Sequence, residues 1–184
     1  FLLKSQSLIV FIFLFASLLT DARSQTVWQK YAGNPVFSPS QISGSFDQQR
    51  VIRPYVLEDS GHYRMWYEGH NGIVSVGEAV SSDGVNWNRL SDTAQISPGP
   101  PGSFDAAGIL KPSVVHNEAG YRMYYYSVYN GTNSIGFASS VDGQVWTKYP
   151  SNPVLGIGSP GSWDDQDVWA PMVLHEDGVY KMWY

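Results

Sequence analysis

One motif with a carboxyl group recurs three times in this sequence and is the first candidate for chemistry. Its copies are Gly44-Ser45-Phe46-Asp47, Gly102-Ser103-Phe104-Asp105 and Gly161-Ser162-Trp163-Asp164. A carboxyl group can exchange a proton with a substrate or attack it as a nucleophile. An Asp just before a strand can also accept hydrogen bonds from backbone N–H groups of its own turn. Because every copy carries the Asp, we favour a structural role for the set.

The segment that follows each of these motifs differs from copy to copy. It covers residues 48–53, 106–111 and 165–170, and a proline follows each copy. Arg50, Gly108 and Asp167 occupy one equivalent position, where only Asp167 is acidic. A residue that occurs in one copy alone is not required by the repeated architecture. Asp167 is therefore our first candidate for a functional carboxylate, and a solvated turn residue is the open alternative.

The elements that must position these side chains also repeat, with a period of 59 residues marked by Trp28, Trp87 and Trp146. Turn residues separate four segments of the first repeat. The predicted strands cover about 51–58, 62–68, 74–81 and 85–90. Large side chains on both faces suit a blade that packs between neighbouring blades. The fold class is therefore all-β, a propeller of four-stranded antiparallel blades.

The third copy of the repeat stops after its second strand, at Tyr184. We place the blade repeats at about 28–87, 87–146 and an incomplete 146–184 within a partial propeller over 25–184. An open stack of blades would expose a large apolar face, which a soluble protein avoids. We therefore expect a propeller that is truncated to about two and a half blades.

The N-terminal segment has the pattern of a signal peptide. Lys4 precedes an apolar run over residues 8–19, and Ala22-Arg23-Ser24 supplies small residues at the two positions that specify cleavage. The run is too short for the roughly 20 residues that span a bilayer. We expect a signal peptide over 1–24, a secreted protein that is extracellular or periplasmic, and no membrane contact after cleavage.

The composition excludes several classes of function. The net charge of −5 and the absence of a Lys/Arg cluster disfavour a nucleic-acid partner. The chain has no Cys, so it has no disulfide or thiolate zinc site, and its four His show no metal-ligand spacing. We predict no metal site and no required cofactor, while a structural calcium ion in the propeller funnel stays an open alternative. Nothing in the sequence indicates the oligomeric state.

Two segments near the end of the chain carry a family resemblance. Asp167-Val168-Trp169-Ala170-Pro171 leads to Gly178-Val179-Tyr180-Lys181-Met182-Trp183-Tyr184. This pattern resembles a blade opening of the five-bladed β-propeller glycosidases, which include arabinanases, levansucrases and invertases (glycoside hydrolase families 43, 32, 62, 68 and 130). The resemblance implies a carbohydrate substrate and carboxylates that reach a central funnel from the first strands of different blades. One acts as base or nucleophile and the other as acid, and their separation sets retention or inversion.

Under this resemblance the candidate catalytic residues are Asp47, Asp105 and Asp167, with Asp47 as the copy of the repeated Asp most open to recruitment. Arg53 and Lys111 share one position and could bind sugar hydroxyls or orient a carboxylate, or could form surface ion pairs.

Trp169 could stack on a sugar, although Ile52 and Leu110 at its equivalent positions favour blade packing. Glu68 is a candidate for substrate binding or for the general acid, and we align it with Ser127 of the next repeat. Glu78, aligned with Phe137, is a further candidate acid. An exposed edge carboxylate is the alternative for both.

The function that these features favour is a secreted glycoside hydrolase that acts on poly- or oligosaccharide through paired carboxylates. A non-catalytic propeller that binds glycan or protein is one alternative, because the blades are much alike. A glycosyltransferase or phosphorylase on the same fold is another. Asp83 and Asp142, in Ser-Ser-Asp-Gly and Ser-Val-Asp-Gly, are interpreted as turn formers.

Overall fold

A computed structural model describes residues 28–129 and 131–184 of the chain. Every strand described here lies in one compact unit, Gly33–Tyr184. The predicted signal peptide at 1–24 lies outside the described residues. Over the described ranges, no helix has the length and apolar character needed to cross a membrane.

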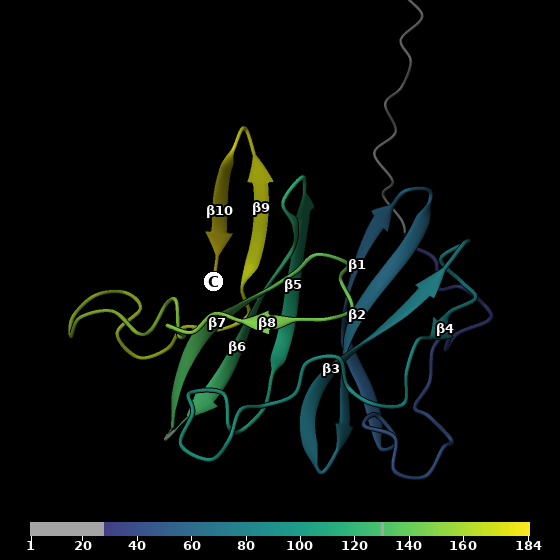
Figure 1. Ribbon diagram of the computed structural model, residues 1–184, viewed down its shortest axis with the longest axis horizontal. Coiled ribbons are helices and arrows are strands. Elements are labelled where there is room, and N and C mark those ends of the chain that lie inside the picture. The colour runs from purple at the N-terminus through teal and green to yellow at the C-terminus, as the bar shows by residue number, and fades with distance from the viewer. Residues whose placement is uncertain (1–27, 130) are drawn as a thin grey trace, which may run out of the picture. The chain divides into compact units, whose positions relative to one another are not determined.

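Antiparallel sheets in simple chain order make up this unit (Figure 1). The first blade contains β1 (Arg50–Asp59), β2 (His62–Asn71), β3 (Ile73–Ser81) and β4 (Asn88–Arg89). The second blade contains β5 (Leu110–Asn117), β6 (Gly120–Tyr129), β7 (Thr132–Ser140) and β8 (Thr147–Lys148). The third repeat contributes β9 (Met172–Glu176) and β10 (Val179–Trp183). The predicted all-β propeller of four-stranded antiparallel blades is confirmed.

The fourth strand of each blade is shorter than predicted because an aspartate turn occupies the residues before it. Asp83 Oδ1 accepts hydrogen bonds from the backbone N–H groups of Val85 at 2.8 Å and Asn86 at 2.7 Å, and these bonds lower the pKa of Asp83. Asp142 does the same in the second blade, where backbone N–H donors lower its pKa to about 2. The interpretation of both residues as turn formers is confirmed.

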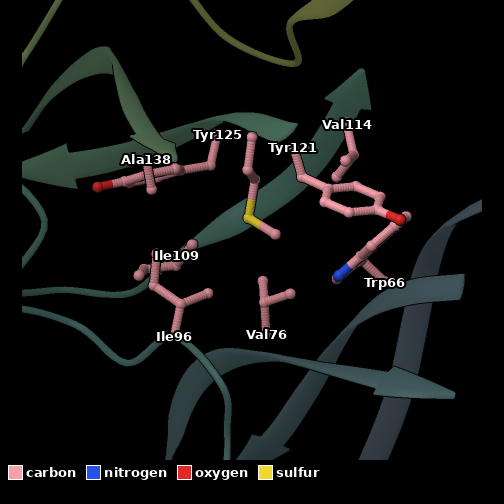
Figure 2. Close-up of a cluster of buried hydrophobic side chains, with 9 residues drawn as sticks. Trp66, Val76, Ile96, Ile109, Val114, Tyr121, Tyr125 and Ala138 are labelled. Atoms are coloured by element: carbon pink, nitrogen blue, oxygen red, sulfur yellow. The ribbon is translucent and has the colours of Figure 1, made fainter. Parts of the chain in front are cut away.

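The main core lies between the first two blades (Figure 2). Trp66 of β2 is fully buried, with its ring 5.8 Å from that of Tyr121 of β6. Its indole Nε1 donates to the carbonyl oxygen of Gly143 at 3.2 Å, so the polar edge of the ring is satisfied. Complete burial of such side chains contributes roughly 1.5–3 kcal/mol each. The repeats therefore pack face to face as neighbouring blades.

A similar contact begins again between the second blade and the third repeat. The guanidinium group of Arg64 lies 4.6 Å above the ring of Tyr121, and the equivalent Arg122 lies 5.1 Å above the ring of Tyr180. Asn117 donates to the hydroxyl group of Tyr180 at 2.6 Å. The same residue types therefore join each blade to the next.

A bulge bends the first strand of both complete blades at equivalent prolines, Pro54 and Pro112. The register with the second strand shifts between Ile52 and Tyr55 in one blade and between Leu110 and Ser113 in the other. Proline has no N–H group to donate to the sheet, so pairing is interrupted there. The residue before each proline has a positive φ: 49° at Arg53, 45° at Lys111 and 56° at Ala170. Because β5 packs alongside both β1 and β9, these three positions lie on or just before neighbouring first strands.

Candidate functional site

The repeated aspartates of the first two blades lie in buried networks. Asp47 is fully buried and accepts hydrogen bonds from the hydroxyl group of Tyr67 at 3.0 Å and from Arg89 Nε at 2.8 Å. Burial, followed by the charge of Asp47, raises the pKa of Tyr67. Arg89 Nη2 adds an ion pair of 2.7 Å to the same carboxylate oxygen. The hydrogen-bond partners of this oxygen therefore all belong to the same blade.

Asp105 has the matching partners in the second blade. It is also buried, and it accepts hydrogen bonds from Ser103, Tyr125 and Lys148. In the third repeat, the hydroxyl group of Tyr184 donates to Asp164 at 3.2 Å, as Tyr67 does to Asp47 in the first. This geometry favours the structural interpretation of the repeated aspartates over the catalytic one.

The residues that differ between repeats converge near the two bulges and the equivalent segment before Pro171. Glu68 of β2 is fully buried, and Arg53 Nη1 donates to its two carboxylate oxygens at 3.2 Å and 3.0 Å. The backbone N–H group of Lys111, on β5, donates to Glu68 Oε1 at 2.6 Å. One buried carboxylate thus joins the side chain of one bulge to the backbone of the next.

His70 extends this arrangement toward the start of β1. Its Nδ1 lies 3.1 Å from Arg50 Nη2, and a guanidinium group can only donate, so Nδ1 accepts. In the neutral ring the proton is then on Nε2, which faces Glu68 Oε2 at 3.6 Å. Burial, followed by the charge of Arg50, lowers the pKa of His70. The neutral form of His70 is therefore favoured, and in this form His70 supplies no negative charge to Arg50.

An aromatic pair borders the same site on the second blade and third repeat. Trp169 is 50% exposed, and Lys111 Nζ lies 4.7 Å from its ring centroid. The ring of Tyr126 lies edge-on to Trp169 with centroids 6.3 Å apart. Burial is the largest cause that raises the pKa of Tyr126, and the charges of Glu68 and Asp167 both add to the rise. Tyr126 therefore lies within electrostatic reach of both carboxylates.

Asp167 is exposed, in contrast to the repeated aspartates. Its Oδ1 accepts a hydrogen bond from the side-chain amide of Asn133, at the start of β7. A cavity of about 290 Å³ opens where the two bulges meet the segment around Pro171. Its walls are Arg53, Pro54, Lys111, Pro112, Ala170, Pro171 and Met172. We call this cavity, together with Arg50, Glu68, His70, Tyr126, Asn133, Asp167 and Trp169, the funnel cluster.

The sheet register corrects one alignment. Glu68 pairs with Ile52 and Val76, and the residue with the corresponding partners in the second blade is Tyr126. The prediction that Ser127 is the counterpart of Glu68 is therefore wrong. The connection between β6 and β7 is one residue longer than that between β2 and β3. Equivalent strand residues of the two blades are therefore 58 positions apart before this connection and 59 positions apart after it.

Glu78 does not belong to the funnel cluster. It is buried on β3, where Arg64 Nε donates to it at 2.6 Å and the side-chain amide of Gln95 at 2.8 Å. The exposed edge position considered for Glu68 and Glu78 is wrong for both, because both carboxylates are buried.

Four members of the funnel cluster were not selected from the sequence: Arg50 and His70, and Tyr126 with Asn133. A spacing of 58 residues would have identified Tyr126 as the counterpart of Glu68. Within 28–129 and 131–184, no group of three or more His, Asp and Glu side chains is placed to hold a metal ion.

The blades and the funnel cluster define the chain as a β-propeller with the fold of glycoside hydrolases. A family 117 glycoside hydrolase from Zobellia galactanivorans superposes with a TM-score of 0.61 at 19% identity, over 77% of this chain and 44% of that structure. A glycosyl hydrolase from Bacteroides ovatus superposes with a TM-score of 0.55 at 20% identity, over 62% and 38%. The predicted resemblance to propeller glycosidases is confirmed for the fold.

Among curated proteins, an uncharacterised protein of Mycobacterium tuberculosis (strain ATCC 25618 / H37Rv) is 33% identical over 145 residues. The match covers 71% of this chain and 44% of the relative. The chain therefore spans less than half the length of this curated relative. No protein-family model matches the chain.

Proposed function

We propose that the protein is a secreted glycoside hydrolase of the five-bladed propeller type, with its carbohydrate site at the funnel cluster. One observation carries this proposal: side chains that differ between repeats gather around neighbouring first strands, whereas Asp47 and Asp105 are enclosed within their blades. Secretion is supported by the apolar run and the small residues before position 25.

In this proposal, Asp167 is the carboxylate that faces the substrate. It is exposed, its side chain is oriented by Asn133, and its charge contributes to the raised pKa of Tyr126. The exposed half of Trp169 offers an apolar surface for a sugar ring. Glu68 is a positioning residue, because it is buried and holds both Arg53 and the backbone of Lys111.

The test is hydrolysis by the Asp167→Asn variant, measured as reducing ends released from a panel of plant and microbial polysaccharides. Loss of an acid, base or nucleophile lowers the rate by about 10²-fold or more. Asp165→Asn is the matched control, since Asp165 is a neighbouring carboxylate that binds the backbone N–H group of Gly161. We expect the control to retain its rate. Equal rates for both variants and the unmodified protein would remove Asp167 from the mechanism.

A further inference from the structure

The funnel cluster has a local charge opposite to that of the whole chain. The net charge of the sequence is −5, yet the cluster contains the cations Arg50, Arg53 and Lys111 against the carboxylates Glu68 and Asp167. Glu68 is already engaged by Arg53. An anionic group is attracted to an excess of positive charge at a concave surface.

Two of these cations have no acidic partner in the part of the chain that the structure describes. Lys111 lines the cavity, and its ammonium group lies over the ring of Trp169 without an ion pair to a described carboxylate. Among the described residues, the guanidinium group of Arg50 has one side-chain partner, the neutral ring nitrogen of His70. Both groups are therefore available to a ligand that brings its own negative charge.

Arg53 also keeps part of its hydrogen-bonding capacity. Its contacts with Glu68 both use Nη1, and its side chain is 38% exposed at the cavity wall. Among the described residues, Nη2 and Nε have no acceptor. A guanidinium edge with two N–H donors matches the two oxygens of a carboxylate. The cavity thus offers a fork at Arg53 and a point charge at Lys111.

We propose that the funnel cluster binds a uronic acid residue, a sugar whose carboxylate is received by Arg53 and Lys111. This inference rests on the proposed carbohydrate site. The half-exposed ring of Trp169 lies directly beside Lys111, so an apolar surface for a sugar ring adjoins the charge that would hold its carboxylate. A free inorganic anion would use the charges but would gain nothing from the ring.

The test compares ligands that differ only in charge, by calorimetry on the full chain. The probes are the methyl glycosides of galacturonate and glucuronate, each beside its neutral methyl ester, with inorganic phosphate as a separate arm. We expect at least one acid to bind at least 10-fold more tightly than its ester in low salt. The preference should disappear in about 0.5 M salt, where the screening length is only a few ångströms.

Lys111→Met removes the ammonium group but keeps the backbone N–H bond to Glu68, so we expect it to reduce the preference for the acid and to leave only the part that Arg53 supplies. Lys181→Met is the control, because Lys181 pairs with Glu176 on a separate strand pair. Equal binding of acid and ester, or binding of phosphate without either acid, would refute the proposal.

The two proposals fail in different ways. Hydrolysis of neutral glycans without a preference for the acid refutes only the uronate proposal. Selective binding of the acid by a protein that hydrolyses no glycoside refutes only the hydrolase.

Discussion

Replacing Asp47 by Asn distinguishes a structural aspartate from a catalytic one. The carboxylate is fully buried, and it receives Arg89 through Nε at 2.8 Å and Nη2 at 2.7 Å together with the hydroxyl group of Tyr67. Removing one partner of a buried ion pair costs roughly 3–5 kcal/mol. Since the side chain of Arg89 is 19% exposed, water can solvate part of its charge, and we expect the lower end, about 3 kcal/mol.

Thermal unfolding gives the readout for this variant. For a chain of this length each kcal/mol shifts the melting temperature by roughly 2–4 °C, so the expected fall is about 6–12 °C. Asp165→Asn, at a half-buried carboxylate whose hydrogen bond from the backbone of Gly161 an Asn oxygen can also accept, should leave the melting temperature within about 1 °C. Hydrolysis per folded molecule should stay the same for Asp47→Asn, because Asp47 lies outside the funnel cluster. A variant with unchanged melting temperature and lost activity would refute the structural role and restore Asp47 as a catalytic candidate.

Two further predictions concern the blades. Gly77→Ala should lower the free energy of unfolding by about 1–3 kcal/mol in a urea titration, because its Cβ would lie 2.1 Å from Phe46 Cζ. Gly156→Ala should change this free energy little, because its Cβ would make only an ordinary contact of 4.0 Å with Ser134 Oγ. The pKa of Asp142 is lowered to about 2 in the folded chain by backbone N–H donors, so its stabilising effect is complete above the unfolded pKa of about 3.8 and is lost as the pH falls toward 2. Asp142→Asn should therefore weaken the acid dependence of the unfolding free energy between pH 4 and pH 2, and an unchanged slope would contradict this origin.

The architecture could be predicted from the sequence because each blade is encoded separately. Equivalent residues perform equivalent tasks: Asp47 and Asp105 bind the same types of partner, and Arg64 and Arg122 each cover a tyrosine of the next repeat. A period in the sequence therefore becomes a period in contacts. The predicted fourth strand of the first blade began too early, because residues of a turn and of a strand can show the same alternating pattern. Only the hydrogen bonds of Asp83 show that a turn precedes the strand.

The funnel cluster could be predicted only in part. Asp167 was found because it differs from its copies, and Arg53 and Lys111 because both place a cation directly before a recurring proline. His70 lies near a turn and has no sequence signal of its own, since its role depends on the approach of Arg50 and Glu68 from other strands. Contacts between strands that are far apart in the sequence have no local pattern. Sequence divergence indicated where to look, and the fold determined which side chains meet.

The strained backbone at the bulges shows how a symmetric scaffold can hold an asymmetric site. Residues with positive φ other than Gly are uncommon, and such strain often occurs at functional positions. Here Ala170, which has no functional side chain, adopts nearly the same φ as Arg53 and Lys111. The strain therefore belongs to the residue before the recurring proline in every repeat rather than to the chemistry. Because the backbone geometry is fixed by the blade, the side chain at this position is free to change, and two of the three blades use it to bring a cation to the cavity.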